Sequence, residues 1–234
     1  MARWMTVVAA AAAIALLPAY PSAAAADGLP VIGFDAGPHG VSTLHKTMRY
    51  VATPRHHETA IKAVARSGQT VRSTVLRGTF DVPVVAYDGS SGGLSGDGRT
   101  LVLIRPRVAF PQRSTTLAVV DTWTLIARRV EQLRGDFSFD AVSPDGTRVY
   151  LIQYTSRTDP TRYRVRALDA STGVLVGRDV VDPRDRGEAM HGSPLARVES
   201  RDGRWAYTLY DGNGKPFVHA LDTAHARADR KSVV

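Results

Sequence analysis

Two short segments contain residue types that could hold a metal ion. His56-His57-Glu58 places three potential ligands in a row. Because adjacent residues of a strand point to opposite faces, a solvated turn is the favoured interpretation. Asp211-Gly-Asn-Gly-Lys215 begins like a calcium loop, with Asp222 at the twelfth position, but it lacks a bidentate glutamate. A plain hairpin turn is favoured there, so we expect no metal ion and no other cofactor.

A third segment, Gly89-Ser-Ser-Gly-Gly93, matches the Gly-x-Ser-x-Gly elbow that presents a nucleophilic serine, here Ser91. The elbow needs a strand before it and a helix after it, and a phosphate-binding loop needs the same helix. The residues that follow, 94–104, have the pattern of a hairpin. A flexible loop is therefore favoured over a catalytic or phosphate-binding one.

A fourth segment, Met190-His-Gly-Ser-Pro194, precedes the predicted innermost strand of the last unit, near where the axial channel of a propeller would open. His191 could bind a ligand or titrate near neutral pH, and Arg197 follows it on the same strand. We therefore regard His191 and Arg197 as the candidate ligand-binding residues. The alternative is that Gly192 and Pro194 only shape the entry to the strand. No set of residues forms a catalytic triad that the sequence alone supports.

These segments lie within a repeated phrase that determines how they are positioned. Its copies begin at Ser95, Ser143 and Ser200, with the sequences Ser-Gly-Asp-Gly-Arg-Thr, Ser-Pro-Asp-Gly-Thr-Arg and Ser-Arg-Asp-Gly-Arg-Trp. Each copy leads into an apolar run and then into an aspartate that closes a further strand. A period of roughly 50 residues indicates one supersecondary unit repeated along the chain.

The unit has the pattern of a four-stranded antiparallel meander. Asp-Gly between two apolar runs predicts a hairpin, because the tight turn requires positive φ. Residues 137–180 contain all four strands, with period-two alternation at 162–169. Residues 82–128 form the preceding unit, residues from Val41 onward form a degenerate one, and 195–222 provide three strands of the last. We predict an all-β fold, an incomplete β-propeller with about 3.5 blades.

The predicted propeller domain covers residues 27–228. Propellers close as rings of four to eight blades, and a half ring leaves two blade faces exposed. Residues 229–234 fit no strand and resemble the translation of a sequencing-library adapter, so we predict that they are a non-native tail. The intact protein would then be several blades longer. The alternative is that the half propeller pairs with a second copy.

The first 26 residues have the layout of a secretory signal peptide. An early arginine is followed by an apolar, alanine-rich stretch at 7–17 and by small residues at 22–26. The apolar stretch is too short to span a bilayer comfortably, so we expect no stable membrane span after cleavage. The chain contains no cysteine, which excludes lipoprotein anchoring and disulfides. We predict a secreted, extracellular or cell-envelope protein, periplasmic in a Gram-negative cell.

The chain has a formal net charge of +8, and most of its basic residues are arginine. Arg162, Arg164 and Arg166 alternate along one predicted strand, where a solvated face is the favoured interpretation. A basic surface could also attract anionic envelope polymers over a distance. Nucleic acid is disfavoured as a partner, since export removes it and no recognition motif accompanies the charge.

The Ser-x-Asp-Gly-Arg hairpins, followed by an apolar strand and Val-x-Asp-Thr, resemble those of secreted bacterial β-propellers of the YVTN and WD40-like class. Residues 137–173 resemble that class most, and a weaker similarity covers about 40–223. The resemblance implies a fold of blades arranged in a ring. Its motifs build hairpins and carry no catalytic residues to transfer.

Two functions are compatible with these observations. The favoured one is a non-enzymatic binding or scaffold module whose loops hold a protein or an envelope glycan, because no catalytic cluster is visible. The alternative is an extracellular propeller enzyme, a lyase or hydrolase, with His191 and Arg197 at the mouth of the axial channel. Fold alone does not choose between them.

Overall fold

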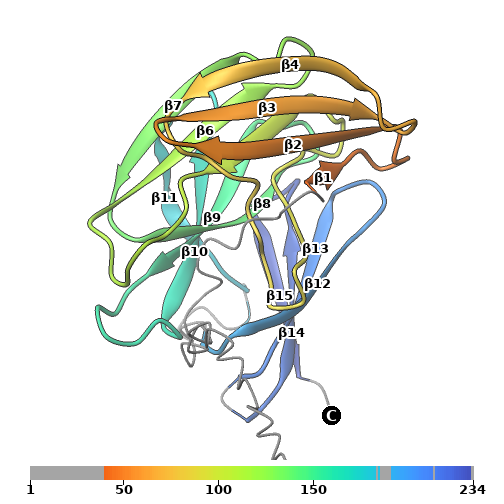
Figure 1. Cartoon of the computed structure of the whole chain (residues 1–234). Coiled ribbons are helices and arrows are strands. Elements are labelled where there is room, and N and C mark those ends of the chain that lie inside the picture. Colours follow the sequence, from red (N-terminus) through yellow and green to blue (C-terminus); the bar gives the residue numbers. More distant parts are fainter. Residues whose placement is uncertain (1–39, 183, 185–190, 213, 233–234) are drawn as a thin grey trace, which may run out of the picture.

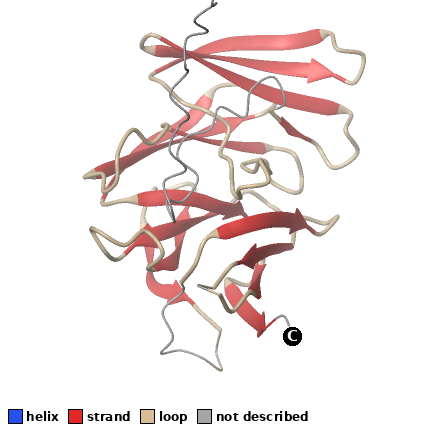
Figure 2. Ribbon diagram, turned by 60° about the horizontal axis from the view of Figure 1, so that its bottom comes forward, coloured by secondary structure: helices blue, strands red, loops and turns tan. Residues whose placement is uncertain are grey.

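The computed structural model describes residues 40–182, 184, 191–212 and 214–232, and every regular element in these ranges is a β-strand. The strands form four antiparallel sheets, and in each sheet the spatial order follows the chain order (Figures 1 and 2). Within the described ranges no helix is long and apolar enough to cross a lipid bilayer. The predicted signal peptide, residues 1–26, lies outside them.

Each sheet is one blade. Blade 1 contains β1 (Val41–Ser42), β2 (Met48–Arg55), β3 (Glu58–Ala65) and β4 (Thr70–Arg77). Blade 2 contains β5 (Thr100–Ile104), β6 (Ser114–Asp121) and β7 (Ala127–Arg134). Blade 3 contains β8 (Phe137–Val142), β9 (Arg148–Tyr154), β10 (Tyr163–Asp169) and β11 (Leu175–Val180). Blade 4 contains β12 (Pro194–Glu199), β13 (Trp205–Tyr210), β14 (Phe217–Asp222) and β15 (Arg227–Ser232).

The repeated phrase forms the same turn in blades 2, 3 and 4. In each, the serine hydroxyl donates to the aspartate Oδ1 over 2.6 Å. The same hydroxyl accepts the amide of the residue that begins, or directly precedes, the next strand's apolar run, for example Thr100. The glycine of each turn has φ near +70°, a conformation that side chains disfavour. These local interactions explain why the phrase recurs.

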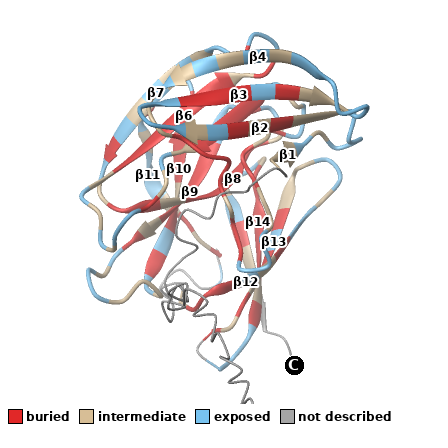
Figure 3. Cartoon of the chain, viewed as in Figure 1, coloured by how far each residue is buried: buried red, intermediate tan, exposed pale blue. Residues whose placement is uncertain are grey.

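The hydrophobic core lies between the blades, because each sheet buries apolar side chains against its neighbour (Figure 3). Ile61 of blade 1 packs in one cluster with Leu101 and Leu103 of blade 2. Phe137 and Phe139 of blade 3 pack with Val102 and Leu117 of blade 2. Between blades 3 and 4, Tyr150 belongs to a cluster with Ala206 and Leu221 and donates its hydroxyl to the carbonyl of Thr223 over 2.6 Å. The predicted fold, an incomplete β-propeller of antiparallel blades, is confirmed by this face-to-face packing.

Blade 2 has an irregular inner edge where a first strand was expected. Residues 81–94 make only isolated bridges, Asp81 with Ile104, Val84 with Ser91 and Leu94 with Leu101. Pro83 has no amide hydrogen to donate, and Gly89 and Gly93 have positive φ, so a continuous ladder does not form.

Blade 4 has one strand more than the sequence indicated. The expectation that 229–234 fits no strand is wrong for residues 229–232, because they belong to β15 and pair with β14 in register from Asp222 with Arg227 to Phe217 with Ser232. An edge strand needs only main-chain N–H and C=O groups, so the side-chain pattern gave little warning. Residues 233 and 234 lie outside the described ranges.

Blades 2 and 4 meet across the centre of the molecule. A Cβ added at Gly96 of blade 2 would lie 2.7 Å from the carbonyl oxygen of Asp202 in blade 4 and 3.3 Å from Cα of Pro144 in blade 3. The amide of Asp97 also donates to the carbonyl of Pro144 over 2.9 Å. The repeated turns of three blades therefore converge on a common axis.

Candidate functional site

The innermost strand of blade 3 presents polar side chains at alternate positions along the axis. Asp136 directly precedes β8, and Ser138 and Asp140 follow within it. The three side chains follow one another as a polar row along the strand, and Asp136 and Ser138 both contact Arg107. Asp140 lies at a β-bulge, where the register with β9 shifts between Phe139 and Ala141. Asp136 and Asp140 are both buried, and each is paired with an arginine from another part of the chain.

Asp140 pairs with Arg197 of β12, the inner strand of blade 4. The Nη1 atom of Arg197 lies 2.7 Å from Asp140 Oδ1 and donates to Thr208 Oγ1 over 2.8 Å, while Nη2 donates to the main-chain carbonyl of Asp140 over 2.7 Å. The two charged side chains are only 3% and 2% exposed. Burial acts to lower the pKa of Arg197, but the charges of Asp140 and Glu199 and the hydrogen bond to Asp140 together raise it above its usual value. The guanidinium therefore stays charged.

Asp136 pairs with Arg107, which lies in the connection between β5 and β6. Arg107 Nη1 lies 2.5 Å from Asp136 Oδ1, and Nη2 donates to the carbonyl of Phe137 over 3.2 Å. The guanidinium also lies 4.9 Å from the ring centroid of Tyr154, whose hydroxyl donates to Ser138 Oγ over 3.0 Å. Burial raises the pKa of Tyr154, so its hydroxyl stays protonated as a hydrogen-bond donor.

Blade 2 sends a loop across the axis to the same inner strand of blade 4. The amides of Tyr87 and Asp88 donate to the carbonyls of Pro194 and Leu195 over 2.9 and 3.1 Å. The carboxylate of Asp88 accepts the amide of Arg197 over 3.2 Å. These contacts occupy main-chain groups of β12 that would otherwise face an axial channel.

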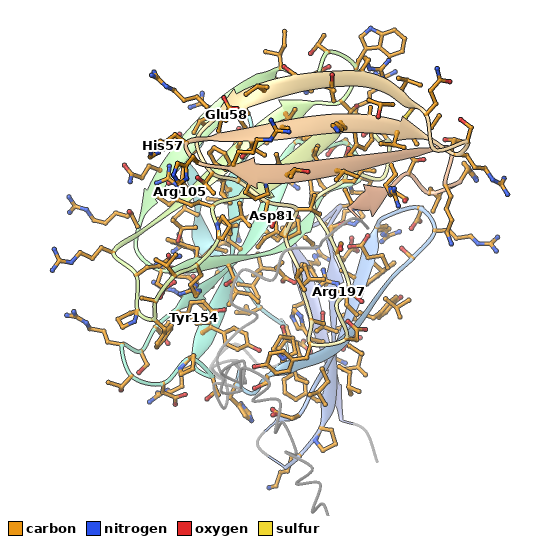
Figure 4. The ribbon with its side chains drawn as sticks, viewed as in Figure 1. His57, Glu58, Asp81, Arg105, Tyr154 and Arg197 are labelled. Carbon is orange, nitrogen blue, oxygen red and sulfur yellow. The ribbon has the colours of Figure 1, made fainter. Side chains whose placement is uncertain are left out.

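A narrow cleft remains between the inner edges of blades 2 and 3. Asp81, Arg107, Ser138 and Tyr154 line it, and Pro194 of blade 4 borders it. Figure 4 shows Asp81, Tyr154 and Arg197 around the middle of the molecule. Only about 40 Å³ of the cleft is open to the centre of a water molecule, far below the 300–1,000 Å³ typical of ligand pockets.

The two candidate residues from the sequence have different surroundings. Arg197 lies against Asp140 and Thr208, with its guanidinium directed into the interface between blades 3 and 4. His191 is half-buried, and its ring lies 5.9 Å from that of Phe217. A Cβ on the next residue, Gly192, would lie 2.6 Å from Asp211 Oδ1 and from the amide nitrogen of residue 212, so this glycine permits a close approach of two loops.

The two segments that resemble metal loops lie in connections between strands. His56 and His57 join β2 to β3, where Arg55 pairs with Glu58. Asp211–Lys215 connects β13 to β14, where Tyr210 pairs with Phe217. Within the described ranges no group of three His, Cys, Asp or Glu side chains is placed to hold a metal ion.

The elbow-like serine does not precede a helix. Ser91 bridges Val84 on the inner edge of blade 2, and residues 94–104 contain a turn followed by β5. The structural context that a nucleophile elbow requires is therefore missing at this position.

Sequence reasoning missed Arg107, Asp136, Asp140 and Tyr154. The alternation of Asp136, Ser138 and Asp140 at the start of the most regular blade is a signal that could have revealed part of the row. Neither arginine partner has such a signal, because each comes from a different blade or connection.

The sequence matches no known protein family and no curated protein. Solved structures with a similar backbone include hydrazine synthase from Kuenenia stuttgartiensis, with 16% identity and a TM-score of 0.48 over 76% of this chain and 51% of that one. A putative TolB from Agrobacterium tumefaciens has 14% identity and a TM-score of 0.46 over 82% and 60% of the two chains. The Swd1 β-propeller domain from Myceliophteria thermophila has 9% identity and a TM-score of 0.46 over 83% and 54%.

This chain thus spans only about half to three-fifths of the length of these structures. At such identities and TM-scores the likeness supports no statement about function. The fold and the axial site define the chain as an incomplete β-propeller on the evidence of its own sheets and of the packing between them.

Proposed function

We propose that this chain is an exported, non-catalytic binding or scaffold module, with a protein or an envelope glycan as its partner. Export is inferred from the signal-peptide layout of residues 1–26, which predicts a location outside the cell or in its envelope. The basic charge of the chain favours anionic partners.

The observation that carries the proposal is the pairing of the charges at the axis. Arg197 with Asp140, and Arg107 with Asp136, are buried ion pairs whose guanidinium groups also donate to nearby main-chain carbonyls. Among the described residues, Arg197 Nε and Asp140 Oδ2 are the atoms of the first pair that have no hydrogen-bond partner. A catalytic acid, base or electrophile must reach a substrate, and these groups are committed to joining blades. The adjoining cleft is also too small for a sugar ring or a peptide. Recognition by exposed loops and turns is therefore the better-supported function.

The alternative of a lyase or hydrolase acting through His191 and Arg197 has less support. Arg197 could act on a substrate only after leaving Asp140, and this would leave the buried carboxylate of Asp140 without its cation. The ring of His191 lies beside that of Phe217, and the next residue, Gly192, lies against the turn at Asp211.

The two functions differ in what happens to a bound polymer. The purified chain would be incubated with acidic and neutral envelope polysaccharides and with envelope protein extracts. We expect retention on at least one of them, with no change in polymer length and with the same retention for His191→Ala. If the native chain shortened a polymer and the His191→Ala variant did not, the proposal would be overturned in favour of the enzyme.

A further inference from the structure

A second and larger hollow lies away from the axis, between blades 1 and 2. Its lining includes Met48, Tyr50 and Arg72 from blade 1 and Arg99, Trp123 and Arg128 from blade 2. About 490 Å³ of it is open to the centre of a water molecule, which is within the range of small-molecule sites. We call this hollow the blade 1–2 groove. It is large enough for a saccharide unit, in contrast to the axial cleft.

The groove has an exposed indole ring on a rigid turn. Trp123 is 77% exposed, although tryptophan usually buries most of its surface. Its turn is held by Asp121, whose Oδ1 accepts the amides of Trp123 and Thr124 over 2.9 and 2.8 Å. The ring is therefore presented to solvent by a fixed backbone.

The turn does not need a tryptophan. In blade 3 the matching turn uses Asp169, whose Oδ1 accepts the amides of Ser171 and Thr172 over 2.9 Å each. Ser171 occupies the position of Trp123, and alanine occupies it in blade 4. The indole is thus an addition to this one turn, which points to a role in contact with something outside the chain.

Arg72 of β4 reaches across the groove toward this ring. Its guanidinium carbon lies 5.2 Å from the Trp123 ring centroid, a cation–π arrangement between two blades. Its Nε is buried and has no hydrogen-bond acceptor among the described residues. A guanidinium offers five N–H donors in a planar fork suited to carboxylates, so Arg72 has donor capacity to spare.

The charge around the groove is positive. The lining contains three arginines, Arg72, Arg99 and Arg128. Its one carboxylate, that of Asp121, is paired with Arg128. The neighbouring carboxylate of Asp97 accepts hydrogen bonds from Ser95 and from the amide of Arg99 within its own turn. The amide of Thr124 and the Arg128 guanidinium lower the pKa of Asp121 to about 2, so the balance of charges is constant near neutral pH.

We propose that the blade 1–2 groove binds an acidic saccharide of the uronic-acid class. The apolar face of a sugar ring would stack on Trp123, and its carboxylate would accept hydrogen bonds from Arg72 and Arg99. A neutral sugar would lack the second interaction, and polyphosphate would lack the first. The proposal rests on the binding function proposed above and specifies its ligand and its site.

The test uses the full chain with an oligogalacturonate as the probe and isothermal titration as the readout. Trp123→Ala and Arg72→Gln are each expected to weaken binding by about tenfold, the equivalent of 1.4 kcal/mol. Trp205→Ala is the matched control, because Trp205 also lies beside an arginine, at 5.5 Å, but on blade 4 with that arginine bound to Asp222. The control should bind like the native chain. The probe should also change the tryptophan fluorescence of a Trp205→Phe variant. Adding Trp123→Ala to that variant should abolish this change.

Other ligands separate this inference from the broader function. Polyphosphate binding as strongly as the oligogalacturonate, with no loss in Trp123→Ala, would overturn the uronic-acid proposal and leave only charge attraction. Probe binding that is equally weakened in Trp205→Ala would overturn the groove as its site. If the chain retained an envelope protein but not the probe, the groove proposal would fail and the binding module would stand. Failure to retain any polymer or protein would overturn both.

Discussion

Replacing Arg197 by alanine is expected to lower the free energy of unfolding by about 3–5 kcal/mol. The substitution removes the guanidinium but leaves the carboxylate of Asp140, 2% exposed, without its cation between blades 3 and 4. Thr208 loses its hydrogen-bond partner at the same time. The change can be measured by urea unfolding followed by circular dichroism, provided that the native and variant transitions are both cooperative.

A matched control is the pair of Arg204 with Asp222, in which the arginine is partly exposed. Asp222 itself is buried, but it also accepts hydrogen bonds from the amides of Ala224 and His225, so it keeps partners when the arginine is removed. The paired atoms are 3.0 Å apart, but the Arg204 side chain is 43% exposed. Arg204→Ala should therefore lower the urea midpoint of unfolding far less than Arg197→Ala does. The double variant Arg197→Met with Asp140→Leu should recover much of the loss, since it removes both buried charges. A cost for Arg197→Ala no greater than that of Arg204→Ala would contradict the buried pair.

Phe139→Ala is expected to have a similar effect, about 3–5 kcal/mol of lost stability. Phe139 is 3% exposed and lies between blades 2 and 3. Its ring is so close to blade 2 that a Cβ at Gly92 would lie 2.8 Å from it. Because the core of the molecule lies between the blades, truncation there leaves a cavity that neither sheet can fill alone.

The comparison for Phe139 is Val130→Ala on β7, where the side chain is 50% exposed. We expect that variant to stay within about 0.5 kcal/mol of the native chain. If Phe139→Ala unfolded at the same urea concentration as Val130→Ala, this result would contradict the packing of blade 3 on blade 2 described above.

The local part of this fold could be predicted from the sequence because local interactions create it. Ser95, Ser143 and Ser200 each cap their own turn, and the glycine that follows supplies the positive φ. The interactions that define these turns lie within five residues, so a repeated phrase was sufficient to locate them.

The axial site could not be predicted in the same way. Arg197 and Asp140 are far apart in the sequence, and their pairing depends on the angle between two blades. Arg107 extends from a connection that has no repeat pattern. The sequence singled out Arg197 as a candidate ligand-binding residue, but nothing in its neighbourhood indicated a carboxylate from β8.

The ends of the pattern were the least predictable parts of the fold. The inner edge of blade 2 contains Pro83 and several glycines, which interrupt a ladder that the repeat alone would continue. The last strand, β15, extends past the domain boundary expected at residue 228, because main-chain pairing with β14 does not depend on a side-chain motif. For the blade 1–2 groove, the sequence contained only Trp123 as a signal, and its meaning required the position of Arg72 on the neighbouring blade.

The convergence of the blades on one axis can be measured directly in solution. Gly96 of blade 2 and Gly203 of blade 4 approach so closely that a Cβ at Gly203 would lie 3.0 Å from Cα of Gly96. With glycine-selective isotope labelling, the α-protons of these two residues should give a strong nuclear Overhauser cross-peak. A spectrum in which both glycines show their sequential cross-peaks but none to each other would contradict the propeller arrangement of blades 2, 3 and 4.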